Sequence, residues 1–271
     1  MQPVADLVRC VRVARTVSPY DDDSCRGDPY NPGQADPFPP THLPRLRTVR
    51  GTGEAQIGLD QALDLTRTGD VWLFRGRKAA DRAIQITTNS PVNHVGMSVV
   101  IDDLPPLMWH AELGRSLPDL WSGKNQRGVQ LHDLRAAVTV WSERYGQRAW
   151  LRQLEPPGTL EMENAVLRTI ARLDGTPFPS TARLASRWLR GRVPDVVRRA
   201  PAQADLETAY CAEVVAVTYE AMGLLSEERQ PHWYDPGRFW SGDELPLSTG
   251  ARLGGEIAVV LDWTSDGSAG G

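Results

Sequence analysis

Alternating and clustered apolar positions predict a globular part that begins near Ile57. Short apolar runs bounded by Gly, Pro or Asp are typical of buried strands, and they cover residues 71–74, 94–101, 107–113, 138–141 and 256–262. Because only a short turn links 94–101 to 107–113, we expect these two strands to pair antiparallel.

Helical patterns cover residues 59–65, 79–86, 160–173, 180–190 and 206–225. The last of these is apolar on nearly all sides, which is typical of a helix buried in a core. Cys211 lies close to its expected start. Strands and helices in this order predict an α+β fold in which a small antiparallel sheet packs against this central helix.

Proline density separates the chain into parts. Residues 18–53 hold seven of the 21 prolines, a density that excludes regular helix or central strand. We therefore expect an N-terminal helix and extended arm over residues 1–56 and a catalytic domain over 57–264. An arginine-rich insertion at 180–203 lies within that domain, and a disordered Gly- and Ser-rich tail covers 265–271.

Charge and cysteine content exclude some functions. The 271 residues carry a net charge of −4, which gives no reason to expect nucleic-acid binding. The chain has no CxxC or HExxH motif, so no zinc site is predicted by motif. We expect no metal or organic cofactor, because a reactive cysteine supplies the chemistry. Cys10 and Cys25 are either free or paired with each other. No basic start precedes an apolar run, and no stretch of about 18 apolar residues is present, so we expect a cytoplasmic protein.

Cys211 and His94 are the candidate reactive residues. A thiol at a helix start is activated by the unpaired backbone N–H groups there, and a nearby imidazole can take its proton. His94 lies in the apolar run Asn93–Val100. Each residue alone has a plain structural interpretation, because cysteine and histidine both occur in ordinary cores.

A third, orienting residue is expected on the strand that follows His94. His110 and Glu112 share one face of that strand, since side chains alternate with period two. Either could fix the tautomer of His94. The other histidines, His42, His132 and His232, lie in polar, loop-like contexts that indicate no such role.

Four short motifs together resemble a known family. They are Gly69–Gly76, Ser90–Met97, Gly175-Thr176-Pro177-Phe178 and Tyr210-Cys211-Ala212-Glu213. In this order they resemble the circularly permuted NlpC-type papain-like cysteine hydrolases, which include the YiiX-like proteins and, more distantly, lecithin:retinol acyltransferase. The likeness covers residues 69–225, and it implies a permuted papain-like fold with histidine before cysteine.

The resemblance implies roles for individual residues. Cys211 would be the nucleophile that forms an acyl-enzyme and His94 its base. His110 occupies the family's third position, with Glu112 as the alternative. Asn93 and Tyr210 are the candidates for oxyanion or substrate contacts, beside the backbone N–H of Cys211.

The substrate is left open among three hypotheses. The first is hydrolysis of an amide or peptide bond, and the second is acyl transfer or thioester cleavage on a lipid. The third is a catalytically silent module that only binds a partner. The segment from Arg183 to Arg199 carries six arginines and Trp188, which would suit contact with an anionic membrane surface or a lid. A solvated helical insertion is the favoured interpretation of this segment.

Overall fold

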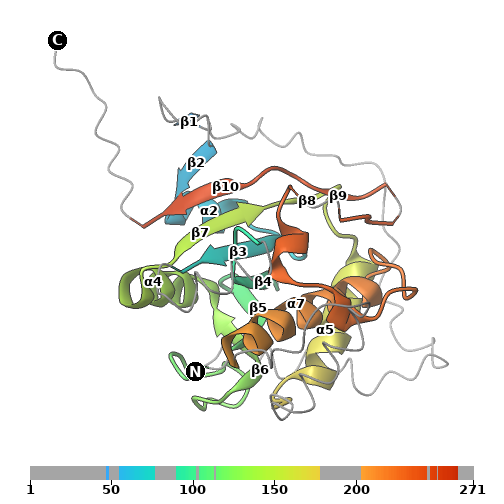
Figure 1. Ribbon diagram of the computed structural model, residues 1–271, viewed down its shortest axis with the longest axis horizontal. Coiled ribbons are helices and arrows are strands. Elements are labelled where there is room, and N and C mark those ends of the chain that lie inside the picture. Colours follow the sequence, from blue (N-terminus) through green and yellow to red (C-terminus); the bar gives the residue numbers. More distant parts are fainter. Residues whose placement is uncertain are drawn as a thin grey trace, which may run out of the picture.

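The computed structural model describes residues 47–48, 55–76, 90–101, 104–112, 114–177, 203–242, 245–248 and 250–261. These ranges form an α+β fold around one large sheet (Figure 1). Several predicted features lie outside the described residues: Cys10, Cys25, the N-terminal arm except residues 47–48 and 55–56, the helix at 79–86, Phe178, the arginine-rich insertion and the tail at 265–271.

The sheet has eight strands in the order β1-β2-β10-β7-β3-β4-β5-β6. Their bounds are β1 Arg47–Thr48, β2 Ala55–Gly58, β10 Ile257–Val260, β7 Arg148–Arg152, β3 Val71–Arg75, β4 His94–Val99, β5 Leu107–Glu112 and β6 Gly128–Asp133. β8 (Leu154–Glu155) and β9 (Arg252–Leu253) form a separate antiparallel pair. The helices are α2 Leu59–Leu65, α4 Leu134–Tyr145, α5 Leu160–Leu173 and α7 Gln203–Ala221, followed by the 3-10 turns η1 Pro231–Trp233 and η2 Pro236–Phe239.

The expected pairing of β4 with β5 is confirmed, but the expected sheet was too small. β2 and β10 come from opposite ends of the described chain and pair parallel to each other, which makes the sheet mixed. A pairing between such distant segments leaves no local signal in the sequence, because register depends on the whole fold.

Each face of the sheet packs against its own set of helices (Figure 1). α7 and α5 cover the face that carries Val95, Met97 and Trp109, and we call this the α7 face. α2 and α4 cover the opposite face, which carries Phe74 and Met108, and we call this the α4 face. A hydrogen bond also ties α7 to the sheet, because the Trp109 indole N–H donates to the Thr218 hydroxyl at 3.1 Å.

α7 is the buried apolar helix that the sequence predicts, but it starts earlier than expected. It begins at Gln203, so Cys211 lies in its third turn and not at its start. The free N–H groups and the dipole charge of a helix are confined to its first turn. The expectation that Cys211 sits at a helix N-terminus is therefore wrong in this structure.

The predicted strand at 138–141 is also wrong, because these residues belong to α4. The β-branched run Val138-Thr139-Val140 favours a strand locally. Leu134, Ala137, Val138 and Trp141 nevertheless recur with helical spacing, and all four are buried. The Asp133 carboxylate caps the helix by accepting from the Ala136 N–H at 2.7 Å, and Gly146 ends it with a positive φ of 64°.

A buried carboxylate holds the loop that precedes β6. Asp119 is fully buried, and its two oxygens accept from the backbone N–H groups of Leu131 and Ser122 at 3.0 and 2.7 Å. Asp174, at the C-terminal end of α5, lies beside it. Burial, together with the charge of Asp119 and a hydrogen bond to it, raises the pKa of Asp174 from 3.8 to about 7.

Replacing Asp174 tests this pairing through the pH dependence of stability. A carboxyl whose pKa is raised on folding stabilises the fold fully at pH values below its unfolded pKa, and this stability is lost as pH rises through about 7. We expect Asp174→Asn to melt close to wild type at pH 4 and above wild type at pH 8. Each 1 kcal/mol corresponds to about 2–4 °C for a chain of this size. Equal melting differences at pH 4 and pH 8 would contradict the pairing.

Candidate functional site

Three histidines lie side by side on the α4 face because of strand alternation. His94 begins β4, His110 lies in β5 and His132 lies in β6, three strands that are neighbours in the sheet. In β5 the indole of Trp109 points to α7, so the adjacent His110 points to α4. In β6 Leu131 packs on the α7 face, so His132 likewise faces α4.

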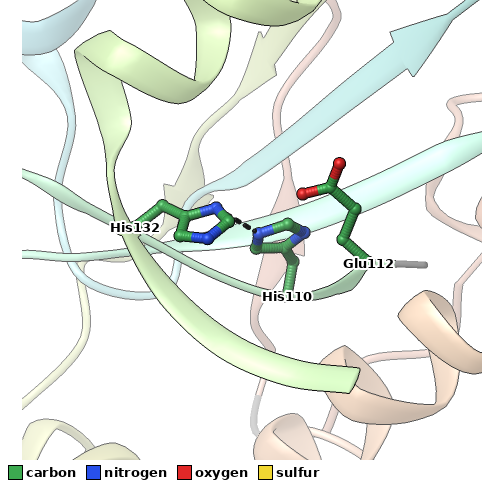
Figure 2. Close-up of side chains that lie close together, drawn as sticks. All are labelled: His110, Glu112 and His132. Carbon is green, nitrogen blue, oxygen red and sulfur yellow. Dashed lines mark hydrogen bonds between the residues drawn. The ribbon is translucent and has the colours of Figure 1, made fainter. Parts of the chain in front are cut away.

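These imidazoles form a continuous line of ring contacts. His94 Nε2 lies 3.2 Å from His110 Nδ1, and His110 Nε2 lies 3.0 Å from His132 Nδ1 (Figure 2 shows the second contact). Both distances are those of hydrogen bonds. The far nitrogen of the line, His132 Nε2, is buried and has no hydrogen-bond partner among the described residues.

Packing holds the line of rings in place. The Trp141 ring of α4 lies edge-on to both His94 and His110, with centroid distances of 5.1 and 4.9 Å. Phe74 packs against His94 from β3 at 5.9 Å. Gly96 leaves room on β4, because a Cβ there would come within 3.3 Å of His110 Cβ and would collide with the Met108 sulfur.

Burial keeps all three imidazoles neutral at pH 7. Desolvation lowers the pKa of His94 to about 3 and that of His132 to about 4, and it lowers the pKa of His110 well below 6.5. The charge of Asp119 acts in the opposite direction on His132. A neutral imidazole carries one hydrogen and one lone pair, so each ring can donate one hydrogen bond and accept one.

Glu112 completes the cluster from the same face of β5. One ligand-type atom from each of His110, Glu112 and His132 lies within 4.8 Å of the others (Figure 2). Glu112 is 7% exposed, and its carboxylate accepts from the Ser116 hydroxyl at 3.1 and 3.3 Å. Glu112 and His94 lie at the ends of their strands, while His110 and His132 are closed off from solvent.

His132 is the member that the sequence analysis missed. It was assigned to a loop-like context, yet it lies in a regular strand and is 1% exposed. The alternation of Val129 and Leu131 with Gln130 and His132 is the signal that identifies this strand. The polar neighbours Gln130 and Asp133 obscure that signal, because they face away from the α7 core or cap a helix.

The structure does not bring Cys211 to the histidines. Cys211 is fully buried in the core between α7 and the sheet, together with Val95 and Ala111. The rings of His94 and His110 pack on the other face with Trp141. The sheet backbone therefore lies between the thiol and the imidazoles.

The two candidate oxyanion residues have structural contacts. The Asn93 side-chain oxygen accepts from the Gly76 N–H at 2.8 Å, and the Asn93 N–H donates to the Phe74 carbonyl at 2.9 Å. Tyr210 is buried beside Cys211 in the α7-face core. These contacts fix the entry to β4 and the packing of α7.

No helix in the described part of the chain combines the length and apolar character needed to cross a bilayer.

No family model matches the chain, and no curated protein matches it. Among solved structures, a similar one is the metalloprotein yiiX from Escherichia coli O157:H7, described as DUF1105. It is 19% identical, with a TM-score of 0.39, over 73% of this chain and 99% of that one. So distant a likeness assigns no role to any residue.

Alkylation tests the separation of Cys211 from His94. In a protein with Cys10 and Cys25 replaced by serine, we expect iodoacetamide to modify native Cys211 slowly, because a buried thiol is inert. Its rate should be the same in His94→Gln. Denaturant should restore the rate of an ordinary thiol. Rapid native alkylation, with a thiol pKa well below about 8.5 that returns to normal in His94→Gln, would show that the two residues form a pair.

Proposed function

We propose that this protein is a hydrolase of amide or ester bonds whose catalytic groups lie on the α4 face: His94, His110, His132 and Glu112. The observation that carries the proposal is the line of three buried, neutral imidazoles from neighbouring strands, with a carboxylate beside it. Clusters of buried groups with strongly shifted pKa values are concentrated at functional sites.

The energetic cost of the cluster supports a functional role. His132 Nε2 is buried and has no partner among the residues that the structure describes, which costs about 1–3 kcal/mol for a polar group. Apolar side chains at positions 94, 110 and 132 would fill the space beneath Trp141 without that cost. A core built only for stability has no need of three imidazoles there.

The line can accept and pass a proton. A neutral imidazole with a free lone pair can take a proton from a water molecule as that water attacks a carbonyl carbon. Because each neutral ring can both donate and accept, a proton gained at one end can be matched by a shift at each of the two hydrogen bonds along the line. His94 and Glu112 are the members nearest solvent, so we assign the substrate to their end of the strands.

Thiol chemistry is the competing proposal, based on the resemblance of the sequence motifs. In it, Cys211 forms an acyl-enzyme with an amide, ester or lipid acyl group, and His94 and His110 serve as base and orienter. This mechanism needs the Cys211 sulfur next to a His94 nitrogen, whereas the two side chains lie on opposite faces of the sheet. We therefore assign attack to a water molecule.

Hydrolysis rates in matched variants test the proposal. A panel of chromogenic amides, esters and thioesters is assayed with wild type, Glu112→Gln, His94→Gln and Cys211→Ala. We expect the Glu112 and His94 variants to lose about 10²–10⁴-fold in kcat, the usual contribution of acid–base groups. Cys211→Ala, a small change within the α7 core, should retain activity.

Two outcomes would contradict the proposal. Loss of activity in Cys211→Ala with activity retained in Glu112→Gln would establish the thiol mechanism instead. Absence of hydrolysis across the whole panel, with a folded protein, would favour a binding module. Circular-dichroism melts of each variant show whether a lost rate reflects lost folding.

A further inference from the structure

We propose that His110, His132 and Glu112 bind a divalent transition-metal ion, with Zn²⁺ as the best match. The site stands on the positions of these side chains and does not require the hydrolase activity. Two imidazoles and one carboxylate are a known ligand set for zinc centres that keep an open position.

The spacing of the ligand atoms supports this assignment. His110 Nε2 and His132 Nδ1 are 3.0 Å apart, and the Glu112 carboxylate lies within 4.8 Å of the cluster. Ligands bound to one zinc ion at about 2.0–2.2 Å lie about 3.3–3.6 Å apart in a tetrahedral site, so the two nitrogens are close to the required spacing and the Glu112 oxygen has to move nearer. Glu112 is the last residue of β5 and is buried, so metal binding requires its carboxylate to turn toward the two nitrogens.

Metal binding would replace the hydrogen bond between His110 and His132 and keep the one between His110 and His94. With a metal between His110 Nε2 and His132 Nδ1, both atoms direct a lone pair to the ion. The hydrogen of His110 then lies on Nδ1 and is donated to His94 Nε2, 3.2 Å away. The hydrogen of His132 lies on Nε2. The rings keep all of their hydrogens, so binding needs a change of tautomer together with a reorientation of the two rings and of Glu112.

Neighbouring residues supply the outer contacts that metal ligands usually have. In the tautomer that metal binding requires, His94 accepts from His110, and the Ser116 hydroxyl donates to Glu112. Such contacts fix the orientation of a ligand and raise its affinity for the metal. Trp141 covers two of the rings and limits the access of water.

The restricted space favours zinc over six-coordinate ions. His110 is 0%, His132 1% and Glu112 7% exposed, so there is little room for the three extra ligands of an octahedral iron or manganese site. Three protein ligands leave one tetrahedral position for water, and zinc lowers the pKa of such a water to about 7. This step rests on the proposed function: that water would be the nucleophile of the hydrolysis. The proton line would then be confined to His94 and His110, because the metal replaces the hydrogen bond between His110 and His132.

Zinc titration of the full-length chain tests the site directly. Cys10 and Cys25 are replaced by serine, because thiols outside the site would also bind zinc. The protein is stripped with a chelator and then titrated with ZnCl₂ by calorimetry. We expect one strong site per chain, with affinity reduced at least about 100-fold in Glu112→Gln and about 10–100-fold in His94→Gln. Cys211→Ala and Glu161→Gln, an exposed carboxylate on α5, are matched controls that should bind as the parent does.

Cobalt substitution gives a second measurement that needs no variant of a buried residue. Co²⁺ in the proposed site should show tetrahedral d–d bands without a sulfur-to-cobalt charge-transfer band. Absence of a strong zinc site, a cobalt spectrum with sulfur ligation, or zinc affinity lost in Cys211→Ala but kept in Glu112→Gln would each overturn the metal site.

The metal site and the hydrolase can fail separately. Zinc bound in the expected pattern, with no hydrolysis of any substrate, leaves the metal site standing and overturns only the proposed function. Hydrolysis at full rate in the chelated, zinc-free protein overturns the catalytic role of the metal and leaves the hydrolase standing.

Discussion

Side-chain alternation along β4, β5 and β6 is the constraint on which the arrangement of this protein depends. Successive residues of a strand point to opposite faces. Each imidazole that faces α4 is therefore next in the sequence to an apolar residue that packs on α7. A register shift of one residue would exchange the two sets and place three imidazoles in the α7 core. The large apolar surface between α7 and the sheet therefore also fixes the position of the polar cluster.

The α4 face solves a second problem, which is how to bury polar rings without charging them. Desolvation makes the imidazolium form costly, and the rings satisfy most of their hydrogen-bonding capacity with one another. Trp141 and Phe74 cover the rings with aromatic edges. His132 Nε2 has no hydrogen-bond partner within the described part of the chain, and this is a local cost of the arrangement.

Local patterns in the sequence predicted much of the fold. The buried runs at β3, β4, β5 and β10 and the helices α2 and α5 lie where their apolar periodicity placed them. Alternation in one strand also placed His110 and Glu112 on a common face. α4 was mistaken for a strand because its β-branched run was weighed above the cap at Asp133 and the spacing of Leu134 and Trp141. The width of the sheet depends on pairing between distant segments, which no local pattern encodes.

The candidate site was predictable only where it is local. Neighbouring strands joined by a short turn bring His94 and His110 together, and their contact in the structure is 3.2 Å. His132 comes from a third strand whose polar positions resemble a loop, so its membership depends on the pairing of β5 with β6. The three metal-ligand candidates span two strands and match no contiguous motif. Cys211 lies in the motif that resembles a thiol enzyme, yet the sheet separates it from the imidazoles.

Anomalous diffraction at the zinc edge, from crystals of the full-length protein grown with Zn²⁺, tests the central claim most directly. The account predicts one strong peak on the α4 face, about 2.0–2.2 Å from His110 Nε2, His132 Nδ1 and a Glu112 oxygen, with Cys211 beyond the sheet. A peak bonded to the Cys211 sulfur, or no peak near the histidines and the Cys211 sulfur in contact with a His94 nitrogen, would contradict it.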